Sequence, residues 1–203
     1  MQHYNITYRK CKANDDFSQV AKYIYLTDDY IYPSICPSYD DSFFQKLILE
    51  CSKDKTNLFY YENLFVALCD DKIIGVLCGI KAGEKKTFLE NISITDEDYK
   101  KISSADKGYF IPLLDENTEF TGYNITNVCV DTNFRAMGIG GGLIEFYLSQ
   151  IPDSTVHLDV IADNMPAIKL YQKHGFEIVN EYNGFSGSDK PLPCYHMIKK
   201  PSV

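Results

Sequence analysis

A strand, a glycine-rich turn, a helix and a second strand follow one another between residues 125 and 161, and this order constrains the fold more than any other feature. The strands are expected at Ile125–Val130 and Val156–Ile161, with the helix at Leu143–Ile151 between them. Apolar residues spaced along one face support the helix. Two strands joined through a helix lie parallel in one sheet, with a right-handed crossover. The sequence therefore predicts a parallel βαβ unit.

Further elements are expected on both sides of this unit. The predicted strands are Tyr4–Tyr8, Leu64–Cys69, Ile73–Ile80, Phe176–Tyr182 and Cys194–Ile198, the second and third forming a hairpin. The predicted helices start after Asp15 or Asp16, span Asp41–Cys51, and span about Asn164–His174 before Gly175. Charged residues fill 83–122, which we interpret as an insertion. All 203 residues are thus expected to form one α/β (α+β) domain, a mixed central β-sheet flanked by helices.

Composition excludes several classes of partner. The formal net charge is −8, from 28 acidic and 20 basic residues. This charge would repel a nucleic acid and suits a cationic substrate better, so we expect no nucleic-acid partner. The longest apolar stretch, Ile73–Ile80, is too short to span a bilayer, so no membrane partner is expected. Seven scattered cysteines without a C-x-x-C pair predict a reducing, cytoplasmic location, and no metal-binding pattern is visible.

Glycines occupy positions 138, 140, 141 and 142, in a run that begins at Arg135 and is expected just ahead of the helix. Free backbone N–H groups and the positive end of a helix would meet there, which favours an anion. The run is not a P-loop, because no G-K-[S/T] follows. It is not a dinucleotide fingerprint either, because no acidic residue ends the next strand in the required register. A tight structural turn is the alternative interpretation.

Two motifs carry a family resemblance. R-A-M-G-I-G at Arg135–Gly140 matches the pattern R/Q-x-x-G-x-G/A, and N-M-P-A-I-K-L-Y-Q-K-H-G-F at Asn164–Phe176 matches N-x-x-A-x-x-L-Y-x-x-x-G-F. In this order and at this distance they resemble the GNAT superfamily of acyl-CoA-dependent N-acetyltransferases. The resemblance covers about residues 124–178.

This resemblance implies a GNAT-type domain that transfers the acetyl group of acetyl-CoA to a primary amine by direct attack, with CoA as product. The residues expected to hold the pyrophosphate are Arg135, Ala136, Met137, Gly138, Ile139, Gly140 and Gly141. Those expected to pair with the pantetheine arm are Val128, Cys129 and Val130, where a bulge would aim one N–H at the thioester carbonyl. One helix face is expected to follow the coenzyme arm, with Asn164, Ala167 and Tyr171.

Tyr171 is the residue expected to carry chemistry. A phenol with a pKa of about 10 can protonate a departing thiolate whose own acid is near about 8.5. A tyrosine packed in the core is the alternative. The start of the coenzyme strand, Tyr123–Ile125, offers no carboxylate as a general base. Glu90, His196 and the cluster Asp28–Tyr32 remain alternatives for that role.

The acceptor is expected to lie against a segment rich in carboxylates and tyrosines. Asp28, Asp29, Tyr30 and Tyr32 would hold an amine-bearing small molecule or peptide by charge and by cation–π contact. The resemblance also implies a homodimer as one assembly. Two other functions stay open. A non-catalytic acyl-CoA-binding or regulatory domain would not need Tyr171, and covalent transfer through Cys129 would need an activated thiolate.

Overall fold

The structure, a computed structural model, describes residues 4–27, 29, 32, 33, 36, 38, 39, 42–84, 86, 121–185 and 191–202. In these residues it forms a mixed sheet of seven strands in the order β1-β2-β3-β4-β5-β7-β6. The strands are β1 (Ile6–Lys10), β2 (Leu64–Cys69), β3 (Lys72–Lys81), β4 (Tyr123–Val130), β5 (Val156–Ile161), β6 (Glu177–Phe185) and β7 (Pro191–Lys199). β4 and β5 run parallel and the other neighbouring strands antiparallel. The predicted fold class and βαβ unit are confirmed.

The α-helices of the described chain are α1 (Phe17–Tyr25), α3 (Ser42–Cys51), α5 (Ile139–Ser149) and α6 (Met165–Lys173). Two short 3-10 helices, η1 (Tyr61–Asn63) and η3 (Thr132–Phe134), precede β2 and α5. α1 starts where predicted, because the Asp16 carboxylate accepts a hydrogen bond from the Ser18 backbone N–H at 3.0 Å. Within the described ranges, no helix is long and apolar enough to cross a membrane.

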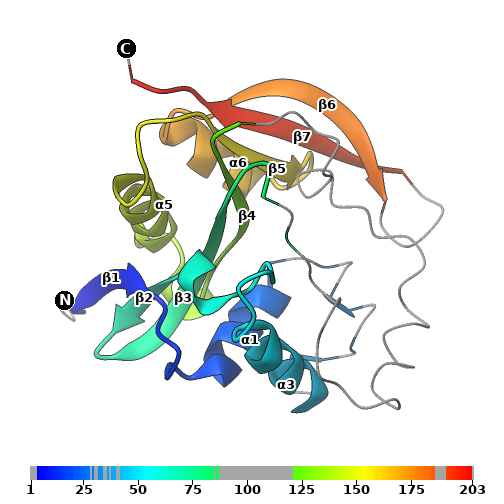
Figure 1. Cartoon of the computed structure of the whole chain (residues 1–203). Helices are drawn as coiled ribbons and strands as arrows, with labels where there is room; N and C mark the ends of the chain where they lie inside the picture. Colours follow the sequence, from blue (N-terminus) through cyan, green and yellow to red (C-terminus); the bar gives the residue numbers. More distant parts are fainter. Residues whose placement is uncertain are drawn as a thin grey trace.

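The sheet separates two apolar cores. α1 and α3 cover one face, where Ile24 and Phe44 are fully buried. α5 and α6 cover the opposite face of the sheet, where Leu143 of α5 lies in the second core. Figure 1 shows α1 and α3 grouped on one side of β2–β4 and α5 on the other. Side chains of β2 alternate between the cores, Val66 entering the first and Phe65 the second. The central strands are therefore held from both sides.

The predicted insertion joins two adjacent antiparallel strands, β3 and β4. Its ends meet where the Ala82 backbone N–H donates to the Gly122 carbonyl oxygen at 2.9 Å. Residue 85 and residues 87–120 lie outside the described part of the chain.

Several predicted boundaries are wrong. β4 starts two residues before the predicted Ile125, β6 ends three residues after Tyr182, and β7 starts three residues before Cys194. Two other differences have a structural reason. β1 is Ile6–Lys10 instead of Tyr4–Tyr8, because its ladder with β2 continues to Lys10, opposite Phe65. α5 begins at Ile139, one turn before the predicted Leu143, because its glycines pack closely against neighbouring elements, as described below.

Candidate active site

The ladder between β4 and β5 is short. Its pairs are Tyr123 with Val156, Asn124 with His157, and Ile125 with Leu158. Beyond Leu158, β5 continues along β7 to Ile161. The backbone groups of Thr126–Val130 that face away from β3 therefore have no strand partner in the described structure. We call the point where this ladder ends, after Ile125 and Leu158, the fork.

β4 carries a bulge at the fork. Asn127 lies opposite Cys78 of β3 and Ile125 lies opposite Gly79, so Thr126 is an extra residue on β4. Such a bulge redirects backbone N–H and C=O groups and ends regular pairing. We expected a bulge within Val128–Val130. It lies earlier, because the ladder with β3 is regular again from Asn127 onward.

The predicted pyrophosphate loop leaves the end of β4 in a sharp turn. Arg135 Nε donates to the Val130 carbonyl oxygen at 3.3 Å, and its backbone N–H donates to the Thr132 carbonyl oxygen at 3.4 Å. Ala136 and Gly138 have positive φ angles of 61° and 81°. Gly138 forms the N-cap of α5. The turn leaves residues 135–138 exposed, but it already uses the Arg135 N–H that was expected to face the pyrophosphate.

The N-terminus of α5 presents free donors. Its first intrahelical hydrogen bond runs from the Gly142 N–H to the Gly138 carbonyl oxygen at 2.9 Å. The N–H groups of Ile139, Gly140 and Gly141 therefore have no acceptor within the helix. They lie at the end where the helix dipole favours a negative charge. Three of the residues predicted to hold the pyrophosphate thus offer free backbone donors to an anion.

The glycines at 140–142 lie inside the first turn of α5, and their predicted position ahead of the helix is wrong. A Cβ atom at Gly140 would lie 3.3 Å from Leu170 Cδ2, and one at Gly141 would lie 2.8 Å from His174 Nε2. Glycine disfavours a helix by itself, so packing explains why α5 starts here. Leu170 is on α6 and His174 caps its C-terminus. This contact places α6 beside the free N–H groups of α5.

Tyr171 follows Leu170 on α6. Its side chain is buried, with its ring edge-on to Phe176 at 6.0 Å between centroids. No hydrogen bond joins its hydroxyl to another described residue. Burial raises the pKa of Tyr171 to about 12, so the phenol stays protonated at neutral pH, as a proton donor requires. At the start of the same helix, Asn164 Oδ1 accepts from the Ala167 N–H at 3.2 Å and caps α6.

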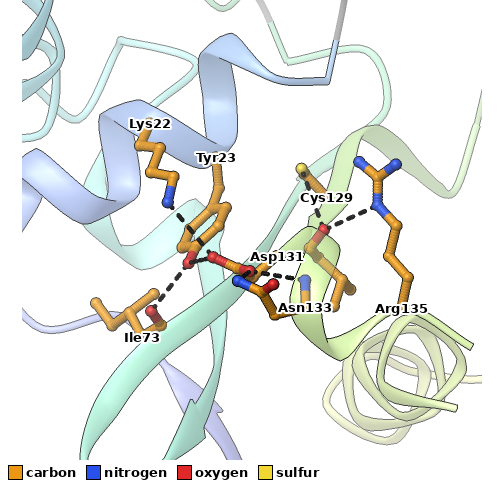
Figure 2. A network of polar contacts seen from close by, with 8 residues as sticks. Lys22, Tyr23, Ile73, Cys129, Asp131, Asn133 and Arg135 are labelled. Carbon is orange, nitrogen blue, oxygen red and sulfur yellow. Dashed lines mark hydrogen bonds and ion pairs between the residues drawn. The ribbon is translucent and has the colours of Figure 1, made fainter. Parts of the chain in front are cut away.

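Figure 2 shows how Asp131 ties the end of β4 to α1. The Tyr23 hydroxyl donates to its carboxylate at 3.0 Å, and Lys22 Nζ lies 3.4 Å from the same oxygen. The Asn133 backbone N–H donates to the other oxygen at 3.0 Å. Burial opposes ionisation, but these hydrogen bonds outweigh it and lower the pKa of Asp131. The carboxylate therefore stays charged and fixes the turn that leads to Arg135. No local sequence pattern marks this network.

The predicted acceptor segment contacts β4 through Tyr32. The Asn127 side-chain amide donates to the Tyr32 hydroxyl at 3.1 Å and to Thr27 Oγ1 at 2.7 Å. Tyr32 is buried, whereas Asp29 is exposed. Two residues predicted for this site lie outside the described residues: Asp28 and Tyr30. The segment thus meets β4 directly after the bulge, on the face covered by α1 and α3.

One of the possible general bases belongs to a buried chain of polar groups. His196 Nδ1 lies 2.8 Å from Asp159 Oδ1, and His196 Nε2 lies 3.2 Å from His157 Nδ1. His157 Nε2 donates to the Thr121 carbonyl oxygen at 3.0 Å. Glu90, another possible base, lies outside the described residues. Asp159 and His157 were not among the predicted site residues, although they alternate with apolar residues on a predicted strand and so lie on its other face.

Cys129 is a buried thiol. Its Sγ lies 3.9 Å from the Val130 carbonyl oxygen. Burial raises the pKa of Cys129 to about 11, so the thiol is protonated at neutral pH. A protonated thiol is a weak nucleophile. This favours direct attack by an amine over covalent transfer through Cys129.

The chain is similar to acetyltransferases in sequence and in fold. The Acetyltransferase (GNAT) family matches residues 28–176. The chain is 38% identical over 55 residues to the L-amino acid N-acetyltransferase AaaT of Escherichia coli (strain K12), a match that covers 25% of this chain and 34% of that protein. An N-acetyltransferase from Staphylococcus aureus Mu50 has a TM-score of 0.70 at 17% identity, with 95% of this chain and 99% of that chain covered. Arabidopsis thaliana Naa50 in complex with the bisubstrate analogue CoA-Ac-MVNAL has a TM-score of 0.54 at 18% identity, with 96% and 98% covered.

The family match extends over more than half of the chain and includes both motifs, Arg135–Gly140 and Asn164–Phe176. The structural matches agree with it in fold across nearly the whole chain. The chain therefore belongs to the GNAT acetyltransferase family.

Proposed function

We propose that this protein is an N-acetyltransferase that moves the acetyl group of acetyl-CoA to a primary amine by direct attack. The observation that carries the proposal is the unpaired edge of β4 beyond the fork, which leads to the free N–H groups at the start of α5. A Cβ atom at Gly140 would lie 3.8 Å from Val130 Cγ2, so the helix end adjoins the unpaired edge of β4. The pantetheine arm would lie along Thr126–Val130 as an added strand does. Its pyrophosphate would accept hydrogen bonds from Ile139–Gly141.

The similar proteins support this cosubstrate and this class of acceptor. The Escherichia coli relative is an L-amino acid N-acetyltransferase, and the Arabidopsis structure holds a bisubstrate analogue that contains CoA. The acceptor of the present chain would accordingly be an amine-bearing small molecule or peptide. The net charge of the protein, −8, favours the approach of an ammonium group. The segment containing Asp29 and Tyr32 would form the acceptor side, because Tyr32 contacts β4 beside the bulge.

Each step of the transfer has a group in this chain to serve it. The amine nitrogen bonds to the thioester carbonyl carbon, and a backbone N–H redirected by the bulge at Thr126 would stabilise the negative charge that develops on the carbonyl oxygen. As the carbon–sulfur bond breaks, Tyr171 gives its hydroxyl proton to the sulfur. The nitrogen, positively charged after the attack, releases a proton to water, and Tyr171 regains a proton from water. The raised pKa of Tyr171 means that the phenol carries this proton at neutral pH before the transfer begins.

The alternative of a non-catalytic CoA-binding domain would use the same fork without Tyr171. The buried phenol, with no hydrogen bond to another described residue, favours the enzyme, because a purely structural tyrosine usually places its hydroxyl on a partner. We also propose a cytoplasmic location, since the seven cysteines, all in the described residues, are buried and form no disulfide bond.

The test measures free thiol released from acetyl-CoA with a panel of L-amino acids, peptides with a free amino terminus, and polyamines. The same compounds with the amine already acetylated serve as controls. The proposal expects thiol release that requires a free amine and yields the acetylated amine by mass spectrometry. CoA binding without such release would support the regulatory alternative, and an absence of both would overturn the proposal.

A further inference from the structure

A chain of hydrogen bonds connects four residues at the fork. It runs from the Thr121 carbonyl oxygen through His157 and His196 to the Asp159 carboxylate, over distances of 3.0, 3.2 and 2.8 Å. The two imidazole rings stack with centroids 5.4 Å apart. Both histidines are buried, at 7% and 8% exposure. Connected titratable groups at this depth act as one unit, because a change of charge on one alters its neighbours.

Asp159 lies directly beyond the fork. It follows Leu158, the last residue of β5 that pairs with β4, and it lies opposite His196 of β7. Leu158 and Val160 point into the core under α5 and α6, so the Asp159 side chain points to the other face of the sheet. Its side chain is 17% exposed. The carboxylate is therefore within reach of solvent on the face that α1 and α3 also cover, beside the unpaired edge of β4.

The partners of each ring nitrogen limit where the protons of these hydrogen bonds can lie. A carbonyl oxygen only accepts, so the first proton lies on His157 Nε2, which faces Thr121. The contacts from His157 to His196 and from His196 to Asp159 each need one further proton. Two neutral imidazoles bring only two protons in all. With the second proton on His196 Nε2, which then donates to His157 Nδ1, the contact between His196 Nδ1 and Asp159 is the one without a proton. With both imidazoles neutral, this series of hydrogen bonds therefore has room for one additional proton.

The added charge belongs on His196. Burial lowers the pKa of His157, which keeps that ring neutral. His196 lies next to the Asp159 carboxylate, so a positive charge on His196 is paired with a negative one at 2.8 Å. With the additional proton, His196 and Asp159 thus form an imidazolium–carboxylate pair that His157 holds in place.

We propose that Asp159, with His196 behind it, removes the proton that an acceptor ammonium must lose before the amine can attack. This inference rests on the proposed N-acetyltransferase function. The ammonium N–H bond breaks, the nitrogen keeps the electron pair, and the proton fills the empty contact between Asp159 and His196. The neutral amine then forms the bond to the thioester carbon. His196 carries the positive charge until the proton leaves to water, and His157 is a positioning residue that orients the His196 ring.

Other titratable groups near Asp159 would not take the place of His196 as the group that receives the proton. Tyr182 of β6 also lies near Asp159, but burial and the carboxylate raise its pKa, so it stays neutral. β4 offers no titratable side chain from Asn124 to Val128. His196, which contacts Asp159 at 2.8 Å, carries the side-chain type whose ordinary pKa lies nearest neutral pH.

The test compares wild type with Asp159→Asn, His196→Gln and His157→Gln over a range of pH, using an amine that the wild type acetylates. Glu177→Gln, which removes an exposed carboxylate from β6, is the matched control. Asp159→Asn and His196→Gln should lower kcat at pH 7 by about 10²-fold. The loss should shrink as the pH passes the pKa of the amine, about 8 for an α-amino group, because the acceptor then arrives without the extra proton. CoA affinity by calorimetry should match the control.

Each outcome decides a separate point. A loss of kcat that is equal at every pH, or activity equal to Glu177→Gln in all three variants, would overturn the role of this chain while leaving acetyl transfer intact. If Asp159→Asn does not fold, the pH profiles of the two histidine variants decide in the same way. A wild-type protein that binds CoA but acetylates no amine would overturn the proposed function, and this inference with it.

Discussion

Ile125 of β4 lies opposite Leu158 of β5 in the last pair of their ladder, and the two strands part directly after it. This relationship organises the candidate site. The extra residue on β4, Thr126, comes next on one strand and Asp159 comes next on the other. The unpaired edge of β4, where we propose that the coenzyme binds, and the proposed proton acceptor thus start at the same level of the sheet.

Tyr171→Phe should lower kcat by roughly 10²-fold and leave CoA affinity nearly unchanged, because only the proton donor to the leaving thiolate is lost. Tyr147→Phe is the matched control. It removes another buried phenol, whose hydroxyl donates to the Asn124 carbonyl oxygen at 3.3 Å, and should affect stability more than turnover. Steady-state rates and calorimetry with CoA measure both effects. Equal turnover of Tyr171→Phe and wild type would show that the phenol is structural.

Asp28→Asn combined with Asp29→Asn should raise the KM of a cationic acceptor and weaken its dependence on salt, with the KM of acetyl-CoA unchanged. The control is Asp70→Asn with Asp71→Asn, which removes the same charge from the turn between β2 and β3. Both of those residues have positive φ angles, 47° and 65°, which asparagine tolerates well. Initial rates at two ionic strengths separate the variants. If both double variants behave alike, the segment at Asp29 is not part of the acceptor site.

The stability of the fold should fall in mild acid partly because of His174. Burial lowers the pKa of His174, although Glu145 opposes this. The unfolded chain, with a histidine pKa of about 6.5, therefore binds the proton first as the pH falls. The contribution of neutral His174 is complete above about pH 6.5 and is lost below it. In urea unfolding, wild type should lose more free energy of unfolding than His174→Gln between about pH 7.5 and about pH 5.5. Parallel losses would contradict this.

Local signals in the sequence located many of the elements. The bounds of β2 were predicted without error, and α6 was bounded correctly by Asn164 and Gly175, because a cap and a positive-φ glycine act within a few residues. The glycines of α5 misled the prediction, since their reason for being helical is contact with Leu170 and His174, which a local pattern does not contain.

Contacts between residues far apart in the chain could not be predicted from the sequence. β7 lies between β5 and β6, so strand order does not follow chain order. The bond from Tyr23 to Asp131 spans 108 residues, and nothing in either segment marks it. The hydrogen bonds that join Asp159, His196 and His157 likewise depend on the pairing of β5 with β7. A motif thus marked the turn at Arg135–Gly138, whereas no local pattern marked the groups that support this turn or the proposed base.

The most direct test of the account measures CoA binding at the start of α5. Gly140→Asp and Gly140→Asn add side chains of nearly equal size beside Leu170, so the difference between them reports the charge alone. A like charge about 5 Å from the pyrophosphate costs roughly 3 kcal/mol at an effective dielectric constant of about 20. We predict by calorimetry that folded Gly140→Asp binds CoA at least about tenfold more weakly than folded Gly140→Asn. Equal affinity of the two variants for CoA would contradict a pyrophosphate site at this helix end.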